Sequence, residues 1–395
     1  MIERQDTSGD ATRRGIARWR ESGRPKVDVS HLLRGTRKNV VGLFAALVVL
    51  YIIFGIKAPN FLTVSNQLSI ALNTSFLAIP AWAMTLVIGC AEIDMSSGPA
   101  VAFAGVLLGV LVTNYGIPLF FGIVIVLAVG TILGAAIGWA RAYLNVPTFV
   151  GSLALYLGFR SLAELFSNAI PISISSGFLG DVGTGSVLGF PNPAWIAIIL
   201  FFVFLVVIRK TPFGRSVLAI GGNPDSARVA GVPVGRRKVA VMAISGAAAA
   251  LTGIILAGEL ASGNSEVEQV LTFQVIAAVI IGGTALFGGR ASMLGTLVGV
   301  IFIETITDGL ILLGVNTYAD GVVTGLLIFA AVTIGAGELH FRRKSRGGRG
   351  RGVERGTREL EASGGVASVE ASRSPTASGL VDVSSVSDSH EGMVP

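Results

Sequence analysis

Apolar runs, most of them near the length of a membrane-spanning helix, recur through most of this sequence. About 20 consecutive apolar residues are needed to cross the roughly 30 Å hydrocarbon layer of a bilayer. Hydrophobic residues make up 52% of the 395 residues and charged residues only 14%, which is too little polar surface for a soluble globule of this size. The sequence therefore predicts an all-α, polytopic membrane protein with about ten transmembrane helices, near Asn39–Ile56, Leu68–Cys90, Val101–Val112, Leu119–Ala140, Phe149–Phe166, Trp195–Ile208, Val239–Leu260, Phe273–Phe287, Leu294–Leu313 and Val322–Ile334.

The positive charges indicate on which side of the membrane the loops lie. Cytoplasmic loops of membrane proteins are enriched in Lys and Arg. The loop Ser167–Pro193 contains neither and is expected outside. We interpret the net charge of +6 as this bias rather than as nucleic-acid binding, and both termini are expected in the cytoplasm. The positive charges that indicate the inner side are Arg141, Arg209, Lys210, Arg290 and Arg342.

Two polar tails flank the apolar part of the chain. Residues 1–38 are Arg-rich and are expected to form a flexible cytoplasmic arm, and residues 341–395 are expected to be disordered because they cannot bury enough apolar surface. The Arg-Gly stretch that opens the second tail is compatible with RNA binding, but beside a membrane a contact with anionic lipid is favoured. Residues 39–340 remain as the transmembrane domain.

One long polar, basic segment, within the loop 209–238, separates two groups of apolar runs. Its part Thr211–Lys238 reads TPFGRSVLAIGGNPDSARVAGVPVGRRK. The side chain of Asn223 can cap a helix, and the next residue, Pro224, suits a first helical position. Gly231 and Pro233 would then end that helix. A short capped helix on the cytoplasmic side is typical of an element that docks a partner. The alternative is an ordinary cytoplasmic loop, which can contain the same capping and helix-ending residues.

Signatures of covalent chemistry are absent from the sequence. There is no GxxxxGK[ST] phosphate loop, so ATP, if it is used, is bound by a partner. There is also no HExxH or CxxC motif, no metal site is predicted, and the three histidines lie outside the apolar runs. The single cysteine, Cys90, lies in an apolar run and is expected to be a buried, unreactive residue. We therefore predict that the chain is not an enzyme and binds no cofactor itself.

Ionisable residues at membrane depth are the remaining candidates for function, because each is costly there unless it meets water, a partner or a substrate. Arg160 and Glu164 are four residues apart, so they can pair on one helix face, either as the polar wall of a pathway or as a packing ion pair. Glu304 and Asp308 have the same spacing but like charge. They line a pathway or mark the outer end of a span. Asp94 is placed to cap the helix that follows it, which is compatible with lining a pathway.

Four segments, in order, resemble the permease subunits of bacterial ABC importers of simple sugars, the ribose type, which are related to branched-chain amino acid permeases. MTLVIGCAEIDMSSG (Met84–Gly98) resembles MTLVI followed by GGIDLSVG. Two further stretches of that family resemble VPTFVGSLALYLGFRSLAELFSNAIPI (Val146–Ile172) and IAAVIIGGTALFGGRASMLGTLVG (Ile276–Gly299). Its cytoplasmic loop resembles TPFGRSVLAIGGNPDSARVAGV. The similarity extends over roughly residues 66–335.

The resemblance implies a helical permease of the bacterial plasma (inner) membrane that works as a pair, either two copies or a copy with a paralogue. It also implies two cytoplasmic ABC ATPase subunits, which bind the ATP, and an extracytoplasmic solute-binding protein that delivers the substrate. The cytoplasmic loop would contain the coupling helix that docks on the ATPase, with contributions from Gly221, Gly222, Asn223, Asp225, Ala227, Arg228 and Gly231.

The expected solute is small and polar, most simply a monosaccharide. The chain departs from the family pattern at Thr272 and Gln274, where acidic residues are frequent, and at Glu92, Glu164 and Glu304, where glycine or apolar residues are usual. The residues expected to line the translocation pathway are Asp94, Arg160, Glu164, Gln274, Glu304 and Asp308.

Three alternatives remain open from the sequence. An ion-coupled secondary transporter would use the intramembrane acids for proton or sodium coupling and would need no ATPase. An ABC permease could instead carry a nucleoside or a branched-chain amino acid. A non-transporting scaffold or sensor would act through its tails.

Overall fold

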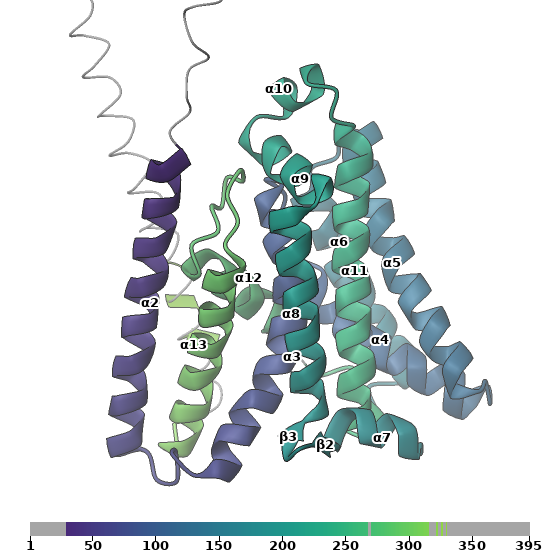
Figure 1. Cartoon of the computed structure of the whole chain (residues 1–395). Helices are drawn as coiled ribbons and strands as arrows, with labels where there is room; N and C mark the ends of the chain where they lie inside the picture. Colours follow the sequence, from purple (N-terminus) through teal and green to yellow (C-terminus); the bar gives the residue numbers. More distant parts are fainter. Residues whose placement is uncertain (1–28, 268–269, 316–320, 323–324, 327–328, 330–395) are drawn as a thin grey trace, which may run out of the picture. The chain divides into compact units, whose positions relative to one another are not determined.

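The computed structural model describes residues 29–267, 270–315, 321–322, 325–326 and 329, and every structural statement below refers to these residues. Helices dominate this part of the chain, as predicted (Figure 1). The helices are α2 (Val29–Lys57), α3 (Val64–Gly89), α4 (Ser97–Gly109) with a π-helical turn (Val110–Asn114), α5 (Leu119–Tyr143), α6 (Thr148–Ser167), α7 (Gly177–Thr184), α8 (Asn192–Lys210), α9 (Pro212–Gly222), α10 (Pro224–Val229), α11 (Val234–Glu259), α12 (Leu271–Ile281) and α13 (Met293–Leu312).

Eight of these helices are long and apolar enough to cross a membrane, so the expected count of ten is not confirmed. The run expected at Phe273–Phe287 contains only the 11-residue helix α12, which ends at Ile281. Gly283, Gly288 and Gly289 follow it with positive φ angles, a conformation that glycine adopts easily and that ends a helix. The last expected run, Val322–Ile334, and the two polar tails lie mostly or wholly outside the described residues.

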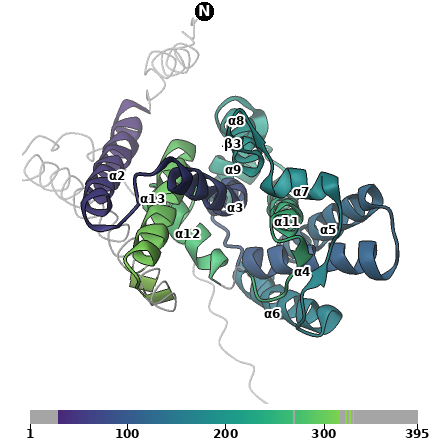
Figure 2. The same cartoon turned by 90° about the horizontal axis from the view of Figure 1, so that it is seen from below.

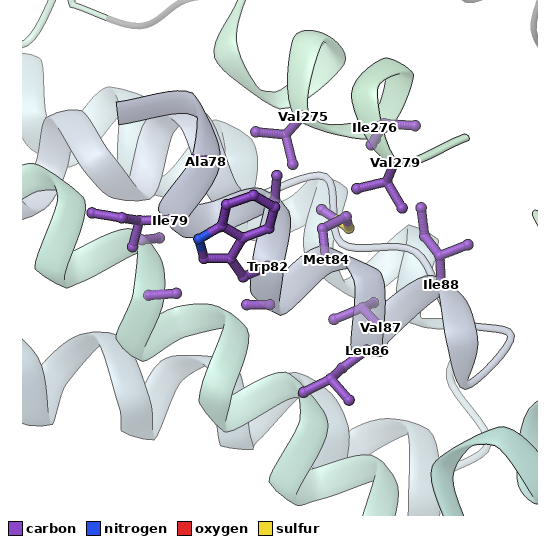
Figure 3. Close-up of a cluster of buried hydrophobic side chains, with 14 of the residues drawn as sticks. Ala78, Ile79, Trp82, Met84, Leu86, Val87, Ile88, Val275, Ile276 and Val279 are labelled. Carbon is purple, nitrogen blue, oxygen red and sulfur yellow. The ribbon is translucent and has the colours of Figure 1, made fainter. Parts of the chain in front are cut away.

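Helix α3 lies at the centre of the packing, between α12 and α13 on one side and α8 and α11 on the other (Figure 2). From Phe76 to Gly89 every residue of α3 is buried. Its apolar side chains, including Trp82 and Ile88, meet Val275, Ile276 and Val279 of α12 (Figure 3). The indole nitrogen of Trp82 also donates a hydrogen bond to the carbonyl of Ala197 in α8. This buried half of α3 connects the groups of helices on its two sides.

Close backbone contact joins α5 to α11. Gly130, Gly134 and Gly138 recur every fourth residue on one face of α5, and a Cβ at any of them would collide with the backbone or a Cβ of α11. Small residues at this spacing let two membrane helices approach closely, which increases the van der Waals contact between them. The backbones of these two helices therefore lie in close contact over at least two turns.

The loop between α6 and α8 contains the short helix α7 (Gly177–Thr184) and three two-residue strands, and a fourth strand follows α11. Strand β1 (Ile172–Ser173) pairs antiparallel with β4 (Ser262–Gly263), and β2 (Ser186–Val187) pairs with β3 (Phe190–Pro191). Helix α7 and the β2–β3 hairpin lie at the end of the bundle opposite α9 and α10 (Figure 1). The long loop without Lys or Arg is thus a folded cap at the end expected to face outside.

Candidate functional site

The basic segment Thr211–Lys238, which the sequence predicts to be cytoplasmic, begins with two short helices, α9 and α10. Thr211 caps α9, and its hydroxyl accepts a hydrogen bond from the amide of Gly214. Asn223 caps α10, and its Oδ1 accepts a hydrogen bond from the amide of Ser226 at 2.9 Å. Pro224 occupies the first turn of α10, and Gly231 follows the helix with a φ of +82°. The cap at Asn223, the proline that follows it and the glycine after the helix are therefore present as predicted.

Helix α10 projects from the bundle with nearly all of its side chains exposed. Only Ala227 is buried, at 5% exposure, and it packs against the neighbouring helices. Asp225 and Arg228 pair with each other at 3.0 Å, and both side chains are more than two-thirds exposed. An exposed ion pair of this kind is worth little and can exchange for other partners. The exposed side of α10 is thus available for a protein partner.

The end of α9 rests directly on two backbone segments of the membrane domain. The position of a Cβ on Gly221 would collide with the carbonyl oxygen of Gly89 and lie 2.5 Å from the amide nitrogen of Gly289. Gly289 in turn donates a hydrogen bond of 3.0 Å to that same carbonyl of Gly89. Because Gly89 ends α3 and Gly289 lies in the loop that leads to α13, the cytoplasmic segment touches both helices at one point.

Between α3 and α4 the linker Cys90–Ser96 is fixed by polar contacts to three helices. The carboxylate of Asp94 accepts hydrogen bonds from its neighbour Ser96 and, at 2.7 Å, from the hydroxyl of Ser245 in α11. The amide of Met95 donates to the hydroxyl of Ser152 in α6 at 2.9 Å. Thr272 of α12 donates to the carbonyl of Met95 and accepts from the amide of Gly98. The linker is therefore held on several sides inside the bundle.

Glu92, in the same linker, is the centre of a buried ion cluster and is only 6% exposed. Its Oε1 accepts hydrogen bonds from Arg141 Nε at 3.0 Å and from Lys238 Nζ, and its Oε2 accepts one from the hydroxyl of Thr148. These partners lie at the end of α5 and near the starts of α11 and α6. Removing one member of a buried ion pair typically costs about 3–5 kcal/mol because a charge is left uncompensated. We call Glu92, Arg141, Thr148 and Lys238 the Glu92 cluster.

The thiol of Cys90, which lies beside this cluster, should be unreactive in the folded protein. It is the single cysteine of the chain and is 1% exposed. Burial raises the pKa of its thiol to about 12, although nearby Lys238 opposes the shift. Since the thiolate is the reactive form, we expect negligible labelling of the folded protein by a maleimide at pH 7.5 and full labelling in SDS. Rapid labelling of the folded permease, measured by gel shift, would contradict this placement.

A polar cavity of about 240 Å³ opens between α3, α12 and α13. Four polar residues and four apolar residues line it: Asn73, Gln274, Glu304 and Thr307, and Phe76, Leu77, Val270 and Leu271. Glu304 lies 11 residues after the start of α13, or about 16 Å along the helix at about 1.5 Å per residue, near the middle of a bilayer. Two larger grooves, of about 600 and 430 Å³, are lined mainly by apolar side chains. Of these three, the cavity near Glu304 has the largest share of polar lining residues.

The structure separates the residues predicted to line a pathway. Gln274 and Glu304 face the same cavity. Asp308, one turn further along α13, instead accepts a hydrogen bond of 2.8 Å from Asn66. Asp94 is 2% exposed and hydrogen-bonded within the linker.

Arg160 and Glu164 form the ion pair that their spacing predicts, with a distance of 3.1 Å between Nε and Oε1. About half of each side chain is exposed on α6, away from the α3, α12 and α13 cavity. Since exposed charge at membrane depth is costly in hydrocarbon, this face of α6 needs a polar or protein neighbour.

Several functional residues were missed from the sequence alone. Arg141 was interpreted only as a marker of the inner side and Lys238 was given no role, yet both bind Glu92. An acidic residue between two apolar runs was the available signal for this cluster. Thr272, noted as a departure from the acidic residue usual in the family, proves to join α12 to the linker. In the described part of the chain, no group of three or more His, Cys, Asp or Glu side chains is placed to hold a metal ion.

Comparisons with known proteins agree with this architecture. A family model described as "Branched-chain amino acid transport system / permease component" matches residues 66–332. The probable ABC transporter permease protein YphD of Escherichia coli K12 is 42% identical over 74% of this chain and 88% of its own length. The ribose import permease protein RbsC of Haemophilus influenzae is 36% identical over 73% and 90%. The L-arabinose ABC transporter permease protein AraH of Azospirillum brasilense is 33% identical over 74% and 86%.

No solved structure gives a significant match. The relatives and the eight candidate spans together place the chain in the bacterial plasma (inner) membrane as a multi-pass protein. The predictions of an all-α, polytopic membrane fold, of the permease family and of the location are thereby confirmed, whereas the count of about ten spans is not. The chain belongs to the family of branched-chain amino acid transport system permease components, and so to the group of ABC permeases that its motifs resemble.

Proposed function

We propose that this chain is the permease subunit of an ATP-driven ABC importer of a monosaccharide. The observation that supports this most directly is the exposed, capped helix α10, joined through α9 to the ends of helices that line a polar cavity at membrane depth. The relatives named for ribose and L-arabinose import support a simple sugar as the solute. The chain itself performs no covalent chemistry.

The partners follow from this assignment. Two ATPase subunits would bind and hydrolyse ATP in the cytoplasm, each receiving one α10. A binding protein would dock on the opposite side, where α7 and the β2–β3 hairpin lie. A second permease, identical or paralogous, would supply the neighbour that the exposed pair Arg160 and Glu164 needs. The cavity of about 240 Å³ is below the usual range of about 300–1,000 Å³ for small-molecule sites, which suits a site completed by a second copy or by movement.

The geometry suggests how a movement of the ATPase subunits could be passed to the cavity that binds the solute. Both Gly89, at the end of α3, and Gly289, before α13, lie under Gly221 of α9. The same α3 and α13 carry Asn73 and Glu304 of the cavity. A movement of α9 would therefore shift two walls of the cavity together. Rocking of packed helices about a fixed site is one way in which transporters alternate access.

Energy dependence in intact cells tests the proposal. Cells that express the chain with its cognate ATPase and binding protein should accumulate labelled ribose or L-arabinose. Uptake should stop when ATP is depleted and persist when an uncoupler collapses the proton gradient. Uptake with the opposite dependence would show an ion-coupled secondary transporter instead. Preferential uptake of a nucleoside or of leucine would keep the importer and replace the monosaccharide.

Helix α10 supplies a prediction about ATPase docking. Replacing both Asp225 and Arg228 with alanine should reduce sugar uptake about tenfold or more, because the exposed charges of a docking helix are lost while the fold is not touched. Membrane insertion and expression should stay normal, since the pair is exposed. The measurement is uptake together with co-purification of the ATPase. Undiminished uptake and co-purification would contradict the assignment of α10.

A further inference from the structure

We propose that Glu92 is a positioning residue for transport: it ties the start of α11, which directly follows the coupling helix, to the linker that contacts the pathway helix α12. The inference rests on the proposed function as an ATP-driven importer. It concerns a buried residue that lines none of the cavities described above.

The first step is the attachment of the cytoplasmic segment to Glu92. Helix α10 ends at Val229, and α11 begins at Val234 after a turn that contains Gly231. Lys238 lies in the second turn of α11, is buried, and donates to Glu92 Oε1. The next residue toward the coupling helix, Arg237, lies over the ring of Phe213 in α9, 5.3 Å from its centroid. The start of α11 is thereby fixed both to α9 and to the linker.

The second step leads from Glu92 to the cavity. Three residues further along the linker, the carbonyl of Met95 accepts a hydrogen bond of 3.2 Å from the hydroxyl of Thr272. The same hydroxyl accepts one of 2.8 Å from the amide of Gly98, the second residue of α4. Thr272 is in the first turn of α12, two residues before the cavity residue Gln274. A displacement of α11 can therefore be passed through the linker to the start of α12.

The charge balance at Glu92 explains why an ionic contact suits this task. One carboxylate faces two cations, Arg141 and Lys238, and Thr148 satisfies its second oxygen. Three helix ends are thus held by a single side chain. A buried carboxylate with this many donors has few alternative positions, because each of them leaves a buried charge without a partner. The contact is consequently rigid, and a rigid contact transmits displacement.

The variant Glu92→Gln tests the proposal in the complete complex of permease, ATPase and binding protein reconstituted in liposomes. It keeps the shape of the side chain but removes the charge. We expect sugar transported per ATP hydrolysed to fall about fivefold to tenfold, within the usual range of coupling between sites. Basal ATP hydrolysis and co-purification of the ATPase should stay within about twofold of the wild-type values, since α10 is unchanged. Glu92→Asp, which keeps the charge, should recover part of the lost coupling.

A double variant separates positioning from simple stability. Glu92→Gln with Lys238→Met removes the more deeply buried of the two cations that lose their carboxylate, and it leaves Arg141, whose side chain is 32% exposed, within reach of water. Folding should therefore recover relative to Glu92→Gln alone. If Glu92 positions α11, transport per ATP stays low in the double variant. Thr131→Val is the matched control, because the Thr131 hydroxyl bonds only to Leu127 of its own helix, and it should transport like the wild type.

The outcomes are distinct. Normal coupling in Glu92→Gln, or full recovery of coupling in the double variant, would overturn the role of Glu92 while leaving the importer intact. Hydrolysis and transport that fall together in proportion would also overturn it. A wild-type complex that hydrolyses ATP but moves no sugar would overturn the proposed function and, with it, this inference.

Discussion

Replacing Gly221 with alanine should reduce sugar uptake at least about tenfold, although alanine favours a helix over glycine by about 1 kcal/mol. The added methyl group would collide with the carbonyl oxygen of Gly89 and lie 2.5 Å from the amide nitrogen of Gly289. Both obstacles are backbone atoms, so no side chain can turn away. Overpacking of this kind typically costs about 1–3 kcal/mol and displaces the backbone. The displaced contact is the one that joins α9 to α3 and to the loop before α13.

The neighbouring Gly222 provides the matched comparison. A Cβ at Gly222 would lie 3.9 Å from its nearest neighbour, the Cα of Gly289, which is an ordinary contact distance. Gly222→Ala should therefore keep most of the uptake, and both variants should be present in the membrane at similar levels. Uptake by initial rate, normalised to permease content, is the measurement. Equal uptake by the two variants would show that the contact between Gly221 and Gly89 does not transmit movement.

Replacing Gln274 or Glu304 with leucine should cause the second large loss. Both side chains line the polar cavity near the middle of the membrane. A hydrogen bond to a sugar hydroxyl contributes about 0.5–1.5 kcal/mol, or about 1.5–3 kcal/mol when the protein group is charged. Uptake at low sugar concentration should thus fall roughly threefold to tenfold for Gln274→Leu and about tenfold to a hundredfold for Glu304→Leu.

The control for these variants lies on the same helix as Glu304. The hydroxyl of Thr305 bonds to the carbonyl of Ile301 in its own helix, and the side chain is fully buried. Thr305→Val should consequently leave the sugar dependence of uptake unchanged. The concentration dependence of initial uptake rates distinguishes the two cases, since loss of a solute contact raises the apparent KM. Unaltered kinetics in both leucine variants would exclude this cavity from the pathway.

Much of the fold could be predicted because the relevant signals are local. Helices long enough to span a bilayer follow from apolar runs. Their orientation stays a prediction from positive charges such as Arg209 and Lys210, the last residues of α8. The cap at Asn223 and the left-handed Gly231 were also predictable, because capping depends on side chains only two or three residues away. The short α12 was harder, since an apolar run does not show where a glycine turn interrupts it.

The contacts between distant segments could not be predicted from one sequence. Glu92 meets Lys238 across 146 positions, and no local rule pairs an acid in one linker with a lysine in another helix. The backbone contact of Gly221 with Gly89 has no side-chain signature at all. For the pathway, spacing correctly predicted that Arg160 and Glu164 pair, but it could not show that Gln274 and Glu304 share a cavity while Asp308 turns to Asn66.

Reconstituted transport tests the central claim most directly. Liposomes that contain the purified permease, ATPase and binding protein, with MgATP at the ATPase side and labelled ribose or L-arabinose at the binding-protein side, should accumulate the sugar against its gradient. A non-hydrolysable ATP analogue should abolish accumulation. Accumulation that proceeds without the ATPase subunit, driven by a proton or sodium gradient alone, would contradict the account of a permease moved through its α10 helix.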